Sequence, residues 1–438
     1  MGLLHWFGGG ILAGSLWSWA GAGLLPIAYL TTRRRRNLTA LVCGLGIGLG
    51  LWRSHHFNLL LQSQRWTGKL SDAVGLVCAP ADRRDGYTFL TICFCDPPTT
   101  VRAKIDPYAD FEIGDYVAVS GSVAAPTSQN NDFDYARYLE RYLVFGTMKQ
   151  PHIVPLTDPP HSNIKLRLWR TLTATRHRIE NQLNRLLPEP EASFLAGLLL
   201  GSRRLIPPDV LADLQKTGTT HIIAVSGANV VIIASFVLIA ARYITFNTRA
   251  AWWLSLIIIW CFVALTGISA AAVRGATVAT FSLWAKHARR HVPATTALII
   301  PAAVSVVINP AILHDLSWQL SYAAFFGIIV IAPWLHNRLA KKTLKLPSIM
   351  IETFAATLTT TPISWWSFGT VSLSGLLVNP LVLGLVPLAT GVGALSVVAS
   401  SLIPVFNPLL RLVTTVVLRS MLTIIHLGSF IPLSWGEK

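Results

Sequence analysis

An apolar tract near the middle of the chain carries polar side chains into its first turns, and this combination limits what the segment can form. Residues 217–230 read TGTTHIIAVSGANV and run into apolar sequence that continues to Ala241. The interior of a bilayer penalises polar groups unless they face protein or water. We therefore expect a membrane helix whose polar residues line a route through protein, with Gly227 removing bulk beside them. The candidates are Thr219, Thr220, His221, Ser226 and Asn229.

The composition is that of an integral membrane protein. Of the 438 residues, 52% are hydrophobic and only 13% are charged, which is about half the charged fraction of soluble domains. Lysine and arginine number 36 against 20 acidic residues, which gives a net charge of +16. Basic cytoplasmic loops and a polyanionic ligand both explain such an excess. The net charge alone therefore does not identify a ligand.

The N-terminal residues 1–56 are expected to form one or more membrane segments. Apolar residues 3–31 precede four consecutive arginines, Arg33 to Arg36, and a second apolar stretch begins at Leu38. Arginine clusters stay cytoplasmic, so the second stretch delivers the following segment to the outside. The first stretch is long for one span and short for two, which leaves the side of Met1 open.

Residues 60–160 differ from the rest of the chain because polar and apolar residues alternate. Alternation of this kind, broken by turn residues, is typical of short strands. The segment therefore predicts an extracytoplasmic, OB-like β domain, a small barrel or sheet. Its expected strands read KLSDAVGLVC, YTFLTICFC, TVRAKI, YVAVSGSV and HIVPL, separated by DRRDG, DPP and PTSQNN.

Three of the five cysteines, Cys78, Cys93 and Cys95, fall in this β domain. If Asp85 and Gly86 form a two-residue hairpin turn, Cys78 lies opposite Cys93. That separation is compatible with a disulfide, and an oxidising compartment would permit it. The sequence shows no spacing typical of a metal site, so we expect neither a metal nor a cofactor.

Residues 164–187 predict an interfacial amphipathic helix. Leu168, Leu172, Ile179 and Leu183 share one helical face, and arginines surround it. Such helices lie at the membrane surface. Contact with anionic lipid and contact with DNA both fit the basic residues.

Residues 190–438 are expected to form the membrane domain. Basic clusters at Arg242 with Arg249, at Lys286 to His291 and at Arg338 to Lys345 fall on one side and should be cytoplasmic. The fold class is therefore a polytopic α-helical membrane protein with an inserted extracytoplasmic OB-like β domain. A short helix at 192–201 and a helix start at Pro207-Pro208 precede spans near 219–243, 251–267, 270–285, 293–308, 316–336, 347–364, 371–390, 391–404 and 408–432.

Four segments resemble the ComEC family, the inner-membrane channel proteins of natural transformation. The run 217–230 resembles the family's TGxxHxxAxSGxH region, although Asn229 stands where the family usually has His. DFDYARY at 132–138 is similar to the FDYxxYL that follows the β domain in that family. NPAILHDLSWQLS at 309–321 and GLLVN ending at Asn379 resemble two further family segments.

This resemblance implies a multi-pass channel of the bacterial inner membrane that passes single-stranded DNA to the cytoplasm. The implied partners are single-stranded DNA, the membrane, a competence DNA receptor and cytoplasmic translocation or recombination proteins. Whether the chain forms a homo-oligomer is left undecided. We expect no enzymatic activity. The sequence holds no Walker A motif and no HxHxDH nuclease motif, so we expect a form without the C-terminal metallo-β-lactamase-like domain.

The resemblance also assigns residues to the DNA path. Arg274 lies in an apolar tract, where a charge costs about 3 kcal/mol at a helix centre. It either contacts phosphate in the pore or extends to the outer interface. Gln319 and Ser321 either line the path or join helices by hydrogen bonds. The full set is Thr219, His221, Ser226, Asn229, Arg274, Gln319, Ser321 and Asn379.

Basic residues elsewhere are candidates for contact with DNA. In the β domain they accompany the rings of Tyr87, Phe89, Phe94, Tyr108 and Tyr116, which either stack on bases or pack the core. In the membrane domain, a channel mouth and contact with lipid headgroups are alternatives for Arg203 and Arg204. The whole set is Arg83, Arg84, Arg102, Lys104, Arg203 and Arg204.

Two other functions fit parts of the sequence. One is an intramembrane hydrolase with Ser226 as nucleophile and His221 or His314 as base. Residues five apart on a helix point about 140° from each other, which argues against a pair formed by His221 and Ser226. The other is a transporter of small anions, which would leave the β domain without a clear task.

Overall fold

The computed structural model divides into two compact units, which are described separately. The first comprises Met1–Ala174 with Ala303–Asp315, and the second comprises Thr175–Ala302 with Leu316–Lys438. The structure describes residues 48, 50–57, 64–79, 81–84, 86–106, 109, 111, 113–127, 135–156, 164–202, 206–223, 227–245, 247–268, 270–287, 294–340, 347–369, 371–372, 374–402, 407–431 and 434–435.

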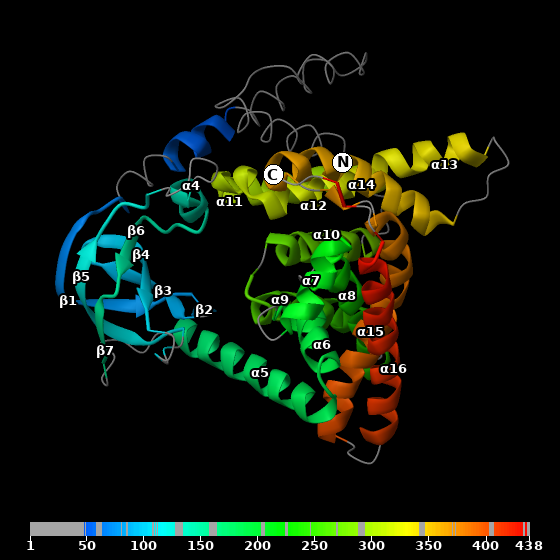
Figure 1. Cartoon of the computed structure of the whole chain (residues 1–438), viewed down its shortest axis with the longest axis horizontal. Helices are drawn as coiled ribbons and strands as arrows, with labels where there is room; N and C mark the ends of the chain where they lie inside the picture. The colour runs from blue at the N-terminus through cyan, green and yellow to red at the C-terminus, as the bar shows by residue number, and fades with distance from the viewer. Residues whose placement is uncertain are drawn as a thin grey trace. The chain divides into compact units, whose positions relative to one another are not determined.

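The first unit contains a curved sheet of seven strands (Figure 1). The sheet order is β6-β4-β3-β1-β5-β7, and β2 pairs with β3 outside this path. All pairings are antiparallel except that of β4 with β6. The strands are β1 (Gly68–Val77), β2 (Asp82–Arg84), β3 (Tyr87–Cys95), β4 (Pro98–Ile105), β5 (Tyr116–Val123), β6 (Gly146–Lys149) and β7 (His152–Pro155).

The sheet curls back on itself. Ala124, directly after β5, and Thr147 in β6 exchange two backbone hydrogen bonds of 2.9 and 2.8 Å. This bridge connects the two ends of the strand path β6-β4-β3-β1-β5. The enclosed core holds Leu90, Ile92, Val101, Ala103, Val117 and Val119, none of which is exposed.

The alternation in β3 follows the sequence prediction. Leu90, Ile92 and Phe94 are buried, whereas Tyr87 and Phe89 are half-buried on the opposite face, because successive side chains of a strand point to opposite faces. Two strands were missed. The segment DRRDG was predicted as a break, yet Asp82–Arg84 forms β2, and β6 was not predicted at all.

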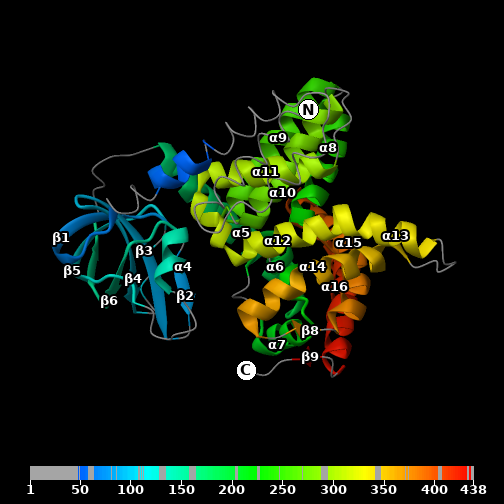
Figure 2. The same cartoon turned by 90° about the horizontal axis from the view of Figure 1, so that it is seen from above.

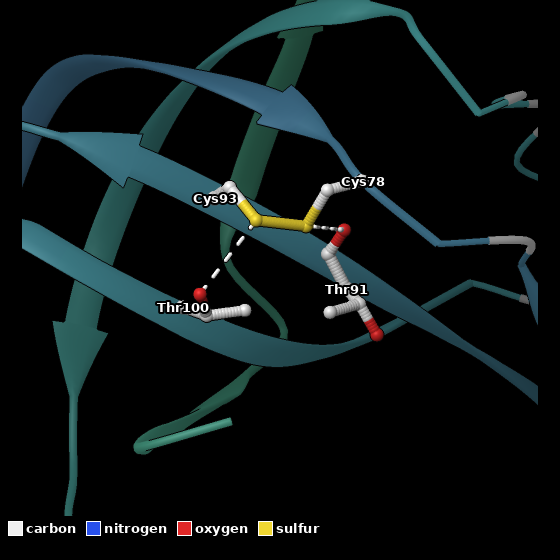
Figure 3. Close-up of a disulfide and its surroundings, with 4 residues drawn as sticks. All are labelled: Cys78, Thr91, Cys93 and Thr100. Atoms are coloured by element: carbon white, nitrogen blue, oxygen red, sulfur yellow. Dashed lines mark hydrogen bonds between the residues drawn. A yellow bond between two sulfur atoms is a disulfide. The ribbon is translucent and has the colours of Figure 1, made fainter. Parts of the chain in front are cut away.

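A disulfide joins Cys78 to Cys93, with a Cα–Cα distance of 6.0 Å (Figure 3). The predicted hairpin register holds in β2, where Arg84 pairs with Tyr87. It does not hold in β1, where Leu76 rather than Cys78 pairs with Cys93. The backbone N–H of Cys78 instead donates to Thr91 O at 3.0 Å. The bridged cysteines are therefore diagonal neighbours across the two strands.

Arg53 fixes the end of helix α11 (Ala294–Ile308) within the first unit. Its Nε donates to Val307 O at 2.7 Å, and its Nη2 donates to Ile308 O at 3.0 Å. Cationic side chains stabilise the free carbonyl groups at helix C-termini in this way. Nearby, the buried rings of Phe57 and Phe145 pack with Ala311. Helix α4 (Tyr135–Arg141) contacts the 3₁₀ helix η3 (Pro310–His314).

The second unit is helical. After α5 (Ile164–Leu186), which begins in the first unit, short helix α6 is entirely buried in the main apolar core. A two-stranded pair joins β8 (Val371–Ser372) to β9 (Ser434–Trp435). The other elements are α6 (Glu191–Leu200), α7 (Pro208–Lys216), η2 (Thr220–Ile222), α8 (Gly227–Thr245), α9 (Thr248–Leu265), α10 (Ala270–His287), α12 (Leu316–Phe326), α13 (Ala332–Ala340), α14 (Ser348–Phe368), α15 (Gly375–Leu402) and α16 (Asn407–Ser429).

Among the described residues, three helices are long and apolar enough to cross a membrane: Leu316–Arg338, Gly375–Ser400 and Asn407–Ser429. The first joins α12 to α13 through a π-helical turn, Gly327–Ile331, and Figure 2 shows the two parts following one line. α15 and α16 lie side by side as an antiparallel pair (Figure 1).

Two predicted boundaries were wrong. The sequence predicted a span from about residue 219, but η2 precedes α8, which starts at Gly227. It also placed two spans at 371–390 and 391–404 with irregular backbone at Pro380 and Pro387. The structure has one continuous helix, α15, through both prolines. A proline removes one hydrogen bond from a helix, and neighbouring helices can compensate for that loss in a membrane.

Candidate channel-lining site

The starts of α8 and α10 meet at two glycines. A Cβ atom on Gly275 would lie 2.5 Å from Gly227 Cα, and a Cβ atom on Gly227 would lie 3.3 Å from Gly275 Cα. No other residue leaves enough room for backbones at this distance. The glycine of the 217–230 motif therefore sets how closely α8 approaches α10.

Arg274 lies beside this contact. A Cβ atom on Gly227 would be 2.9 Å from Arg274 Nη2, and the guanidinium carbon lies 5.5 Å from the centre of the Tyr322 ring. Nη1 is buried and has no hydrogen-bond partner in the described part of the chain. A buried N–H group without an acceptor is costly. The arginine is thus held between a glycine and an aromatic face with part of its hydrogen-bonding capacity unused.

The threonines of the motif surround the end of α7. Thr217 Oγ1 donates to Asp213 O at 2.8 Å and lies 2.7 Å from Thr219 Oγ1. Thr220 Oγ1 donates to Leu214 O at 3.1 Å. Thr217 and Thr219 are fully buried. These hydroxyl groups give second hydrogen bonds to carbonyl groups at the end of α7, since Asp213 O and Leu214 O also accept from the backbone N–H groups of Thr217 and Thr219.

Asn379 lies next to this helix end. Ser374 Oγ donates to Lys216 O at 3.2 Å, directly before α15 begins. A Cβ atom on Gly375 would lie 3.0 Å from Thr217 O and 3.2 Å from Asn379 Nδ2. Asn379 Oδ1 is buried and has no hydrogen-bond partner among the described residues. The structure thus brings Thr219 and Asn379 to the same region.

The remaining motif residues have separate surroundings. Asn229, in α8, donates from Nδ2 to Leu198 O at 3.1 Å and is buried. His221 is exposed, and its Nδ1 lies 3.1 Å from Gly218 O. Ser226 lies outside the described residues. Asn229 therefore connects α8 to the C-terminal part of α6, whereas the histidine contacts the turn before it.

Helix α12 contributes a residue that the sequence analysis missed. Gln319 and Ser321 are half-buried, and the residue that contacts Arg274 is the buried Tyr322. Gln319 and Tyr322 are three residues apart and share a helical face. An aromatic residue directly after the polar pair was a visible signal, because an aromatic face attracts a guanidinium.

In the β domain, Arg102 and Lys104 lie on the outer face of β4. Arg102 Nη2 is 2.7 Å from Asp82 Oδ2, and its side chain is only 11% exposed. The guanidinium also covers the ring of Phe89 at 4.3 Å. Lys104 Nζ is 4.0 Å from the Tyr87 ring. The charge of Arg102 is therefore paired, while Lys104 lies next to exposed Lys149 of β6.

Several other residues that were predicted to contact DNA have side chains outside the part of the chain that the structure describes. Arg83 and Arg84 belong to strand β2, but their side chains lie outside the described residues, as do Arg203, Arg204 and Tyr108. Phe94 is 5% exposed in the barrel core, so its ring does not face solvent. No group of three or more His, Cys, Asp or Glu side chains in the described ranges could hold a metal ion.

Comparison with known proteins gives the family. Residues 198–437, which are 240 of the 438 residues, match the family model described as Competence protein. The chain is 27% identical over 198 residues to ComE operon protein 3 of Bacillus subtilis (strain 168). That alignment covers 45% of this chain and 25% of the relative, so the chain matches about a quarter of that protein's length. No solved structure matches. The matched region contains Arg274, Tyr322, Asn379 and the motif at 217–230, and the chain belongs to the ComEC family of competence proteins.

Proposed function

We propose that this protein is a multi-pass channel of the bacterial inner membrane that passes single-stranded DNA into the cytoplasm during natural transformation. Membership of the competence family supports a role in DNA uptake. The proposal includes no catalytic activity and no cofactor. Its partners would be the DNA strand, a competence DNA receptor and cytoplasmic proteins that receive the strand.

The observation that carries the proposal is the position of Arg274. Its helix, α10, is apolar around it, yet Nη1 is buried and has no acceptor among the residues that the structure describes. A phosphate oxygen of a passing strand would supply the missing acceptor, and arginine binds phosphate through two parallel hydrogen bonds. On the α8 side, the missing side chain of Gly227 leaves the room that the guanidinium occupies.

The β domain would act outside the membrane. Its disulfide supports an oxidising compartment, which the cytoplasm is not. Three features support an OB-type barrel: β1 pairs with both β3 and β5, β4 pairs in parallel with β6, and a bridge from Thr147 of β6 to Ala124 closes the sheet. Barrels of this type bind single strands with aromatic rings and basic side chains on one face.

The test is the fate of labelled DNA in naturally transformable cells. In cells lacking this protein, DNA should reach the periplasm and fail to reach the cytoplasm, and the intact gene should restore entry. Normal cytoplasmic entry in the deletion strain would exclude the proposal. Loss of periplasmic DNA as well would place the protein at an earlier step than the inner membrane.

A further inference from the structure

A second arginine lies in the membrane domain where lipid cannot surround it. Arg419 is one residue beyond the midpoint of α16, and its side chain is 68% exposed. α16 is one of the helices long and apolar enough to span a membrane. A charged side chain at the centre of a span costs about 3 kcal/mol or more unless it meets water, protein or a counter-ion. The exposed part of Arg419 therefore needs polar surroundings.

Pairing with Glu191 meets only part of this need. Arg419 Nε donates to Glu191 Oε1 at 2.9 Å, and this carboxylate is 1% exposed. The second oxygen, Oε2, is buried without a hydrogen-bond partner in the described part of the chain. A guanidinium carries five N–H donors in a planar fork. A contact through Nε alone leaves the terminal nitrogens for a second acceptor.

Polar side chains continue along the same edge of α16. Arg411, Thr415 and Arg419 follow at spacings of four residues, and His426 follows seven residues later, so all four share one side of the helix. His426 Nδ1 lies 2.7 Å from Asp213 Oδ2 of α7. Thr415 Oγ1 is buried without a hydrogen-bond partner in the residues described.

The neighbouring side of α16 is apolar and exposed. It carries the exposed side chains of Leu409, Val416 and Leu427, which hydrocarbon can cover. The helix thus has three sides: one buried in the core, one suited to lipid, and an edge with four polar side chains between residues 411 and 426, interrupted by Leu422. A contact with a partner protein would need a polar side chain at only one place on this edge. A route for a polar solute needs polar side chains at several depths in the membrane.

We propose that this polar edge of α16 lines a water-filled groove, and that Arg419 binds a phosphate of the DNA strand there. The inference rests on the proposed function and adds a second phosphate contact to Arg274. Glu191 holds the guanidinium through Nε and leaves the terminal nitrogens directed at the strand. The phosphate is recognised by charge and by the fork of N–H donors, without regard to base sequence.

Cysteine reactivity tests the groove directly in the full-length protein reconstituted in lipid nanodiscs. Cys43, Cys95 and Cys261 are replaced by Ser, and the bridged Cys78 and Cys93 are kept. A charged methanethiosulfonate reagent should modify Arg419→Cys at least about tenfold faster than Val416→Cys, since the reagent enters water and not lipid. A single-stranded oligonucleotide should slow the reaction at position 419.

Several outcomes would overturn the inference. Equally slow modification at positions 416 and 419 would place Arg419 against lipid or protein, and a disulfide between two copies at position 419 would show that a second copy covers it. Protection by DNA of Arg274→Cys but not of Arg419→Cys would remove the groove and leave the proposed channel intact. Protection at neither position would contradict both proposals.

Uptake measurements separate phosphate binding from a structural ion pair. Arg419→Gln should lower cytoplasmic DNA entry about tenfold, as expected for the loss of one charge-assisted hydrogen bond. Glu191→Gln keeps a hydrogen-bond acceptor for Nε and keeps the Arg419 charge, so it should lower entry less than Arg419→Gln does. Equal defects in the two variants at equal protein level would show that Arg419 acts only through its pair, and would overturn the inference.

Discussion

Gly227 provides the space that the guanidinium of Arg274 occupies, because a Cβ atom at this glycine would lie 2.9 Å from Arg274 Nη2. The nearest neighbour of Gly275 is instead backbone, since its Cβ atom would be 2.5 Å from Gly227 Cα. A side-chain end can move aside more easily than a backbone. A side chain added at Gly275 should therefore disturb the structure more than one added at Gly227.

We expect Gly275→Ala to lower the free energy of unfolding more than Gly227→Ala does. Overpacking a close contact costs about 1 to 3 kcal/mol, and the upper part of this range applies where backbone must move. Gly384→Ala in α15 is the matched control, since among the described residues no atom beyond its own stretch of helix lies within 4 Å of its Cβ position. Thermal unfolding in detergent measures all three. Equal stability of the two variants would refute the backbone contact.

Replacement of Arg274 should reduce DNA entry without loss of the protein. Arg274→Gln removes the charge that we propose contacts phosphate, and Arg274→Lys should keep part of the activity only if charge alone matters. Arg249→Gln, at an exposed position at the start of α9, controls for the loss of one positive charge. Unchanged transformation by Arg274→Gln at equal protein level would exclude the phosphate contact.

Loss of the disulfide should destabilise the β domain alone. Cys78 and Cys93 close a loop with a sequence separation of 15 residues, and a loop of this length contributes about 3 kcal/mol by restricting the unfolded chain. Hydrogen exchange in the full-length protein should therefore accelerate in β1 and β3 when both cysteines are replaced by Ser. Cys95→Ser, which removes a free and exposed thiol, should leave exchange unchanged.

The outer face of the β domain should bind single-stranded DNA weakly and with strong salt dependence. Lys104→Gln together with Lys149→Gln should flatten the plot of log affinity against log salt by about 0.7 per lysine that contacts phosphate. Arg102→Gln should instead destabilise the domain, since it removes the ion pair with Asp82 at a side chain that is only 11% exposed. Fluorescence anisotropy with a labelled oligonucleotide measures the slopes. Identical slopes for wild type and the double variant would remove these lysines from the interface.

The basic loops predict which side of the membrane each segment faces. Cysteines placed at Asp134 and Asn309 should react with an impermeant reagent added outside, and cysteines at Arg36, His287 and Lys342 should not. Of these positions, the structure describes Asn309 and His287. Labelling of position 287 from outside would invalidate the topology.

Local periodicity made much of the fold predictable. The faces of β3 and the start of α7 at Pro208 follow from side-chain spacing and from a proline at a helix start. β6 could not be found in this way, because its four residues are held as a strand by partners distant in the chain, chiefly β4, about 45 positions earlier. Pro380 and Pro387 led to the opposite error, a predicted break where the structure has a continuous helix, because packing of α15 against its neighbours tolerates both prolines.

The sequence nominates candidate residues for the site but does not give their contacts. The motif at 217–230 and Arg274 were recognised separately, but the sequence does not say that Gly227 lies against Arg274. That contact joins residues 47 positions apart, and only the crossing of α8 and α10 creates it. The role of Thr217 and Thr219 at the end of α7 was likewise invisible, because a threonine hydroxyl that serves a carbonyl looks the same in sequence as one that faces water.

The π-helical turn Gly327–Ile331 changes which neighbours the two parts of its helix can address. One wide turn takes up about one extra residue, so every side chain after Ile331 is rotated by about 100° from its position in an uninterrupted α-helix. Gly327 sits at this turn with no room for a Cβ atom, which would lie 2.5 Å from Ala355 O of α14. Deleting one residue within 328–331 would restore the ordinary winding and turn Trp334 and Arg338 toward different neighbours, while the apolar character of the span stayed nearly the same. A hydropathy profile does not detect such a change, so the rotation of this helix, and not its composition, determines what its C-terminal end can contact.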